Sequence, residues 1–298
     1  MRTPPAEYLI RQRVAALERV LPAAKEGDVR SLHQARVATR RLRAAVPLCG
    51  SGRKAEKLAR AVRRLTRVLG PARELDVGVL ILDELEESDD VPRAAIERLR
   101  AAIADERRRL QEHVHDRLDE FDVQKLRKRA VSLVRKDASE KITRGVDAAA
   151  LARERTARRA QRVVASIENA AGLYLPERLH QVRIAVKKLR YTLELGSPTR
   201  DGRPRNVAAL RLLKSMQDLL GRMHDLEMLI ARARSIQSSP GASTLKMSGD
   251  LDRLVRRLET ECRELHGHYM ARRGKLIAVC DRLTRATERS DGARTSAA

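Results

Sequence analysis

Two short segments of the chain each carry one histidine followed by arginines or lysines at helical spacing. Residues 33–43 read HQARVATRRLR, and residues 180–190 read HQVRIAVKKLR. A helix turns by about 100° per residue, so each histidine shares one side of its helix with the cations three, seven and ten positions later. Guanidinium and ammonium groups in such a row can bind several phosphate oxygens at once. The spacing therefore indicates binding of a phosphate-bearing anion.

We name these sets the N-terminal basic row (His33, Arg36, Arg40 and Arg43) and the C-terminal basic row (His180, Arg183, Lys187 and Arg190). An apolar stripe runs alongside each row on the same helix. It comprises Leu32, Ala35, Leu42 and Val46 in the first segment and Leu179, Val182, Leu189 and Leu193 in the second. Each row is therefore expected to border the core. Like charges held there are costly unless an anion or acidic residues neutralise them, which favours a role in anion binding.

A second pair of similar segments follows the two rows in the same order. Residues 69–77 read LGPARELDV, and residues 220–228 read LGRMHDLEM. Two matching motifs in matching order imply an internal duplication. The helix predicted before the first Leu-Gly segment adds a basic side made of Lys57, Arg60, Arg63, Arg64 and Arg67. The second copy keeps only Arg211 and Lys214, with Ala208, Ser215 and Asp218 elsewhere, so we expect a thinner basic surface there.

The chain as a whole is strongly basic. Its 298 residues include 63 Lys or Arg and 40 Asp or Glu, a formal net charge of +23 at neutral pH. Such an excess favours a polyanionic partner, because phosphate polymers release counterions on binding. Aromatic residues make up only 2% of the chain, which argues against stacking on unpaired bases. No segment predicts a signal peptide or a membrane span, so we expect a cytoplasmic protein with no membrane partner.

The sequence lacks motifs for catalysis and for metal binding. Cys49, Cys262 and Cys280 are widely spaced and form no Cys-x-x-Cys pair, so neither zinc nor a disulfide is predicted. A Gly-rich phosphate loop and a nucleophile elbow are also missing. We expect no metal, no cofactor and no enzymatic activity. The remaining histidines expected on exposed helix faces are His113, His115, His266 and His268.

Apolar residues recur at helical spacing along most of the chain, and the alternation typical of strands is lacking. The chain is therefore predicted to be all-α. Helices are predicted near 6–26, 31–49, 53–70, 73–87, 92–120 and 122–137, and then near 147–173, 176–196, 204–221, 222–237, 248–269 and 271–288. Residues 290–298 are predicted to form a disordered tail.

The two basic rows and the two Leu-Gly segments resemble the motifs of the CHAD family, the histidine-containing α-helical domains. The similarity covers roughly residues 6–289. It implies two pseudo-symmetric four-helix bundles, one in residues 1–138 and one in residues 139–289, whose His-Arg helices face a central basic groove or pore. It also implies non-catalytic binding of inorganic polyphosphate, with phosphate or sulfate ions able to take its place, and a route to polyphosphate granules.

Matched position by position, the resemblance assigns polyphosphate binding to His33, Arg36, Arg40, Arg41, Arg43, Arg60, Arg63, Arg64, Arg67, His180, Arg183, Lys187, Lys188, Arg190, Arg211 and Lys214. The two copies differ where the first has Arg73-Glu74 and the second has His224-Asp225. Two alternatives remain open. The same basic surface could bind nucleic acid, or an exposed histidine of a row could accept a phosphoryl group in a phosphorelay.

Overall fold

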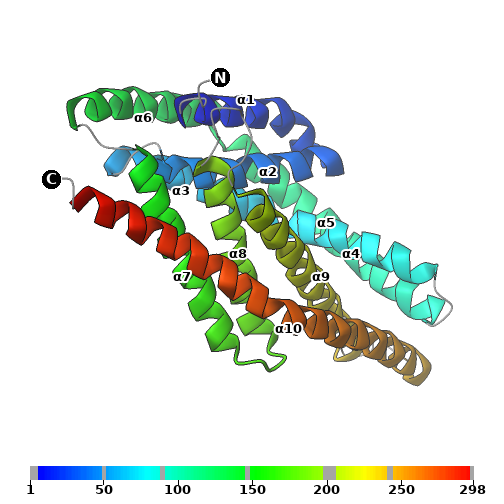
Figure 1. Cartoon of the computed structure of the whole chain (residues 1–298). Coiled ribbons are helices and arrows are strands. Elements are labelled where there is room, and N and C mark those ends of the chain that lie inside the picture. Colours follow the sequence, from blue (N-terminus) through cyan, green and yellow to red (C-terminus); the bar gives the residue numbers. More distant parts are fainter. Residues whose placement is uncertain are drawn as a thin grey trace. The chain divides into compact units, whose positions relative to one another are not determined.

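The computed structural model describes the backbone of residues 6–48, 52–87, 91–144, 148–196, 206–239 and 244–295. The elements in these ranges are all helices, so the all-α prediction is confirmed (Figure 1). They are α1 (Ala6–Lys25), α2 (Val29–Ala45), the short 3-10 helix η1 (Val46–Leu48), α3 (Arg53–Val68), α4 (Gly70–Glu86), α5 (Arg93–Asp119), α6 (Val123–Arg144), α7 (Ala148–Ala170), α8 (Pro176–Gly196), α9 (Val207–Gln237) and α10 (Leu245–Thr295).

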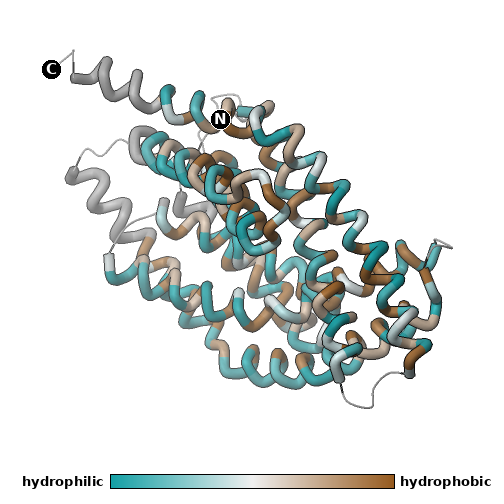
Figure 2. The backbone as a smooth tube through the Cα atoms, turned by 90° about the horizontal axis from the view of Figure 1, so that it is seen from below, coloured by the Kyte–Doolittle hydropathy of each residue, from teal (hydrophilic) through white to brown (hydrophobic). Residues whose placement is uncertain are grey.

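Helical periodicity and local capping account for these elements. Figure 2 shows hydrophilic and hydrophobic residues interspersed along the helices, as amphipathic helices require. The start of α2 is fixed by Asp28, whose carboxylate accepts a hydrogen bond of 2.7 Å from the backbone N–H of Ser31. This is the N-cap arrangement that satisfies a free amide at a helix start. The cap therefore fixes the start of α2, the helix that carries the N-terminal basic row.

The described residues group into two compact units. The N-terminal unit comprises residues within 4–145 and 228–258, and the C-terminal unit comprises residues within 146–227 and 259–298. This division differs from consecutive halves at 1–138 and 139–289. Position 138 lies inside α6, and residues 228–258 group with the first part of the chain. Both α9 and α10 therefore contribute to both units.

In the N-terminal unit, α1 packs along α2, and α4 packs along α5. The end of α9 belongs to the same unit through an ion pair between Arg232 and Glu106, with Nε and Oε2 3.1 Å apart. It also approaches α4 closely, because a Cβ on Gly78 would lie 3.3 Å from a methyl group of Leu229. The second part of α9 is thus a packing element for the helix that carries the Leu-Gly segment.

The core of the C-terminal unit draws on four helices. Its buried residues include Val163 and Ile167 of α7, Val182 of α8, Met216 of α9 and Leu276 of α10. The helices α7 and α8 pack against each other as a hairpin joined by residues 171–175. This core holds the helix that carries the C-terminal basic row against the first part of α9.

Two predicted helix breaks are wrong. The structure has one helix, α9, where breaks at 221–222 were expected, and one helix, α10, across residue 270. An isolated glycine costs a helix only about 1 kcal/mol, so Gly221 does not interrupt α9. Residues 290–295 belong to α10, while Cys49, 197–205 and 296–298 lie outside the described residues.

Candidate functional site

The N-terminal basic row lies at the border of the core, as the sequence predicts. The apolar stripe beside it is buried, with Leu32, Ala35, Leu42 and Val46 at most 1% exposed. Arg36, Arg40 and Arg43 are half-buried, and His33 is exposed. The stem of each arginine is therefore held against the core border while part of its guanidinium remains accessible.

Arg36 connects the row to the first Leu-Gly segment. Its Nη1 donates hydrogen bonds to the carbonyl oxygens of Leu69, at 3.4 Å, and of Gly70. A Cβ on Gly70 would lie 3.5 Å from the same nitrogen, which is an ordinary contact distance, so the guanidinium lies directly beside this glycine. The two motifs found separately in the sequence are thus in contact in the N-terminal unit.

His33, at the start of the row, is coupled to a buried carboxylate on α4. Partial burial of its ring, followed by the charges of Arg73, Arg40 and Arg36, lowers the pKa of His33 below its usual value, while Asp76 opposes this. Burial raises the pKa of Asp76, although Arg107 lies 3.4 Å from its Oδ1. At neutral pH, His33 therefore acts as a neutral hydrogen-bonding group and not as a cation.

The C-terminal basic row occupies the equivalent border on α8. Leu179, Val182, Leu189 and Leu193 are buried, and all four members of the row are half-buried. Arg183 lies beside the second Leu-Gly segment, since a Cβ on Gly221 would be 3.7 Å from its Nε. That Nε is buried and has no hydrogen-bond partner among the described residues. The same pair of motifs therefore meets here, with a donor of Arg183 unused.

His180 pairs with a histidine that the sequence analysis did not include in the site. Its Nδ1 lies 3.3 Å from Nδ1 of His224, and the ring centroids are 4.4 Å apart. One nitrogen must donate and the other accept, so the two rings cannot both carry a proton there. Burial, then the charges of Arg183, His180 and Lys187, lower the pKa of His224 to about 4. His224 is therefore neutral at physiological pH.

A half-buried polar cluster includes Glu227, which lies about one turn after His224 on α9. The hydroxyl of Tyr174 donates a hydrogen bond to Glu227, which occupies the position of Asp76 in the other copy. Burial raises the pKa of Tyr174 and, to about 11, that of Cys262. His266 packs edge-on against Tyr174 with ring centroids 5.3 Å apart. The prediction that His266 is solvent-exposed is therefore wrong, because the ring is half-buried in this cluster.

Three predicted binding residues differ in orientation or pairing from the other residues of the two basic rows. Arg41 is exposed, and its charge, in addition to burial, lowers the pKa of Arg13 on α1. Lys188 lines a cavity against α7. Each lies about 100° around its helix from the preceding basic residue of its row. Arg190 is paired with Glu194 at 3.3 Å and stacks 4.9 Å above the ring of Tyr191. Its charge is therefore partly neutralised.

The basic side of α3 is exposed at Arg60, Arg63, Arg64 and Arg67. On α9, Arg211 is exposed, but Lys214 forms an ion pair of 2.8 Å with Asp218. Ser215 itself supplies no positive charge. Arg272 of α10 brings a cation to this position, because its Nη1 donates to the Ser215 hydroxyl at 3.2 Å. Arg272 could not be found by comparing the two copies, because it comes from a helix outside the repeated motifs.

Within the described residues, no three His, Cys, Asp or Glu side chains are grouped closely enough to hold a metal ion. In the same part of the chain, no helix is both long and apolar enough to cross a membrane. How the two basic rows face each other stays a prediction of the family resemblance.

Comparisons with known proteins agree with the helical architecture. The crystal structure of the CHAD domain from the plant Ricinus communis has a TM-score of 0.59 and 21% identity, and the match covers 93% of this chain and 89% of that chain. PptA from Streptomyces chartreusis has a TM-score of 0.55 and 14% identity, over 95% of this chain and 98% of that chain. No curated protein matches the chain. A family model for the CHAD domain matches residues 8–234. Since that match spans most of the sequence, the chain belongs to the CHAD domain family.

Proposed function

We propose that the chain binds inorganic polyphosphate, without cleaving it, through the N-terminal and C-terminal basic rows. Membership in the CHAD family supports this proposal, because polyphosphate is the ligand that the family motifs imply. The net charge of +23 supports a polyanionic ligand independently of the family. The basic side of α3, together with Arg211, Lys214 and Arg272, would contact further phosphates of the polymer outside the two rows.

One observation carries the proposal most strongly. In each unit, the first arginine of the basic row packs beside the glycine of the Leu-Gly segment, Arg36 beside Gly70 and Arg183 beside Gly221. Packing at the core border restrains a side chain that would otherwise lose conformational freedom on binding. The following cations of each row lie about one helical turn, or about 5.4 Å, further along. Each helix thus offers a pre-ordered line of cations that suits a linear polyanion.

The half-buried position of the rows favours polyphosphate over duplex nucleic acid. Duplex phosphates lie on a wide cylinder and are bound by exposed side chains or by a helix inserted into a groove. The guanidinium groups of Arg36, Arg40 and Arg183 are only partly accessible. A thin polymer without bases can reach such groups, and each phosphate can accept charge-assisted hydrogen bonds.

Titration of long-chain polyphosphate and of duplex DNA at increasing salt tests the proposal. We expect tighter binding of polyphosphate at every salt concentration, and a steep fall in affinity with salt that reflects several phosphate contacts. The length of the polyphosphate, followed by gel electrophoresis, should not change during long incubation with the protein. Equal affinity for duplex DNA, or shortening of the polymer, would contradict the proposal.

Binding of this kind would also bring the protein to polyphosphate-rich granules in the cytoplasm. A fluorescent fusion should overlap with stained granules, and a fusion with reversed charges in both rows should be diffuse. The comparison separates granule recruitment through the rows from recruitment by another part of the chain.

A further inference from the structure

We propose that the C-terminal unit has a second anion site, in a cavity between α7 and α8, that binds a compact diphosphate group independently of the basic rows. The cavity has a volume of about 180 Å³ and is lined by Arg159, Arg162, Ser166, Gln181, Ile184, Ala185 and Lys188. We call it the α7–α8 pocket. Three of its lining residues are cations, and none is a carboxylate.

The hairpin geometry explains how the cations come together. The helices α7 and α8 are joined by residues 171–175, so residues equally distant from this turn lie at the same level. Arg159 on α7 and Lys188 on α8 are at nearly the same distance from it. Ser166 and Gln181 lie nearer to the turn at a common level. The pocket therefore has a cationic end and a neutral polar end.

The cationic end has a charge arrangement that an anion would relieve. Arg159 is half-buried, and burial followed by the charges of Arg162 and Arg155 lowers the pKa of Arg159. No carboxylate lines the pocket to offset these charges. Holding like charges together beside apolar Ile184 costs stability, and a bound anion would recover it. The charge cluster thus favours a ligand with more than one negative charge.

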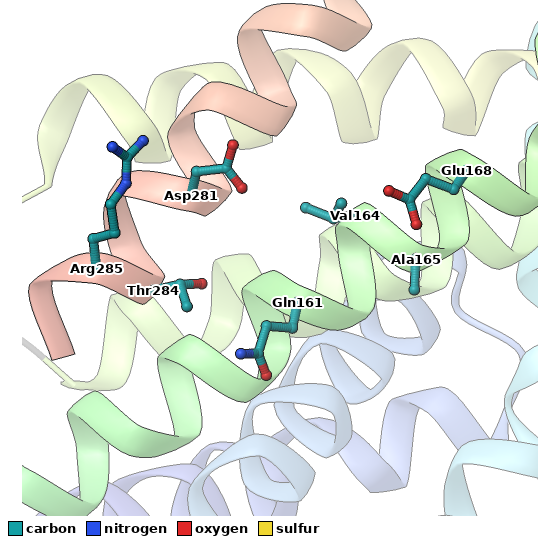
Figure 3. A pocket seen from close by; sticks show the side chains of 7 residues that line it. All are labelled: Gln161, Val164, Ala165, Glu168, Asp281, Thr284 and Arg285. Atoms are coloured by element: carbon teal, nitrogen blue, oxygen red, sulfur yellow. The ribbon is translucent and has the colours of Figure 1, made fainter. Parts of the chain in front are cut away.

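A larger pocket in the same unit provides a contrast. It lies between α7 and α10 and has a volume of about 470 Å³. Figure 3 shows the carboxylates of Glu168 and Asp281 pointing toward the space between these helices, with Arg285 at one side. Two carboxylates against one cation would repel a phosphate group. Among these two pockets, only the α7–α8 pocket has the charge for an anion.

The donors of the α7–α8 pocket suit phosphate oxygens. Two guanidinium groups, one ammonium group and the Gln181 amide can all donate. The Ser166 hydroxyl already donates to the Val163 carbonyl at 2.7 Å, so it contributes no donor. Pockets for drug-sized ligands have volumes of about 300–1,000 Å³, and this one is smaller. It therefore fits a compact group such as pyrophosphate and not a whole nucleotide.

The pocket lies on a different side of α8 from the C-terminal basic row. Lys187 belongs to the row, whereas Lys188, the next residue, lines the pocket. The two ammonium groups therefore report on two different surfaces. Their acylation rates, measured separately by tandem mass spectrometry, distinguish ligand binding at the pocket from binding at the row.

The experiment measures acylation of Lys187 and Lys188 in the full chain with and without inorganic pyrophosphate. We expect pyrophosphate to slow acylation of Lys188 more than that of Lys187. In Arg159→Gln/Arg162→Gln, the pyrophosphate concentration that protects Lys188 should rise by about tenfold or more, since charge-assisted hydrogen bonds are lost. The single variant Arg162→Gln, at an exposed position, should show the same direction and tests the site if the double variant folds poorly.

The control variant is Arg158→Gln/Arg178→Gln, which also removes two positive charges, one from α7 and one from α8, at residues that do not line the pocket. Arg158 is paired with Glu154, and Arg178 donates to the Asn169 carbonyl. Protection of Lys188 should be unchanged in this control and in a variant with neutralised basic rows. Equal loss of protection in the control, or no protection of Lys188 in the wild type, would overturn the proposal. Failure of long-chain polyphosphate to bind would contradict the proposed function and leave this result standing.

Discussion

The Leu-Gly segment bends the chain in the N-terminal unit and lies within a continuous helix in the C-terminal unit. Pro71 follows Gly70, and α3 ends at Val68 before α4 begins at Gly70. Arg222 occupies the equivalent position in the continuous helix α9. Proline lacks an N–H and clashes with the preceding helical turn, which accounts for the bend. Two segments that share a Leu-Gly start thus have different local backbones.

The bend changes the role of the arginine packed against it. Arg36 donates to the carbonyls of Leu69 and Gly70 at the junction of α3 and α4. Arg183 beside Gly221 has a buried Nε with no partner among the described residues. The N-terminal arginine therefore contributes to folding through these hydrogen bonds, whereas Nε of its C-terminal counterpart donates to none of the described residues. Sequence matching alone assigns both the same role.

The largest expected effect comes from placing the proline of one copy into the other. Arg222→Pro should lower the free energy of unfolding by at least about 3 kcal/mol, because it breaks α9 and removes the 2.8 Å ion pair with Glu261. Pro71→Ala should change it by less than about 1 kcal/mol. Chemical denaturation measures both. If Arg222→Pro were as mild as Pro71→Ala, the two segments would not differ in backbone as described.

The second largest effect is a pH dependence of stability that comes from His224 in the C-terminal unit. His224 has a folded pKa of about 4, below the unfolded value of about 6.5. The unfolded state therefore takes up the proton first, and stability is lost as the pH falls from about 6.5 toward 4. Between pH 7 and 5 this loss is about 2 kcal/mol. The matching residue of the N-terminal unit, Arg73, is an arginine and not a histidine.

Urea denaturation of the wild type and of His224→Gln at pH 7 and pH 5 measures the loss of stability that is due to His224. The variant should lose about 2 kcal/mol less on acidification than the wild type does. The general repulsion in a basic protein at low pH is common to both proteins and cancels. An identical loss in the two would show that His224 is not held in its neutral form.

Replacing Arg36 should mainly lower stability, and replacing Arg183 should mainly weaken polyphosphate binding. Arg36→Ala removes hydrogen bonds to two backbone carbonyls and should cost about 1–2 kcal/mol of stability. Arg183→Ala should cost less stability but weaken polyphosphate binding more. Denaturation and calorimetric titration of the two variants, side by side, give both quantities. The reverse order in both measurements would remove the distinction between a structural and a ligand-binding arginine.

The smallest effect concerns the ion pair on α9. Asp218→Asn would release Lys214 from its 2.8 Å contact and remove one repulsive charge. Polyphosphate affinity should rise by about twofold to threefold, consistent with the small energy of an exposed ion pair. Glu154→Gln, which releases Arg158 on another side of the C-terminal unit, is the matched control and should leave affinity nearly unchanged.

Helical periodicity predicted much of this arrangement. It placed Arg36 and Arg183 beside buried stripes, because the side of a helix that a residue occupies depends only on its sequence position. It failed at Gly221, where the weak helix-breaking tendency of glycine was overridden by packing around α9. The family resemblance assigns Lys188 the same role as Lys187, and the two lie about 100° apart on α8.

Contacts between distant segments were not accessible from sequence. His224 was visible only as a mismatch with Arg73, and its contact with His180 depends on how α8 and α9 pack. Arg272 lies outside both repeated motifs and reaches Ser215 from α10. Periodicity assigns a residue to a side of its own helix and carries no information about which other helix packs there.

Charge reversal in both rows tests whether the two basic rows bind polyphosphate. Arg36→Glu/Arg183→Glu should weaken long-chain polyphosphate binding by about a hundredfold or more, because each change replaces an attraction by a repulsion. Arg40→Glu/Lys187→Glu serves as a second pair that spares the hydrogen bonds of Arg36 to backbone carbonyls. The control, Arg108→Glu/Arg158→Glu, alters arginines that are paired on exposed surfaces. With helix content unchanged by circular dichroism, we expect loss of binding in both row variants and near wild-type binding in the control. Undiminished binding in the two folded row variants would contradict binding through the rows.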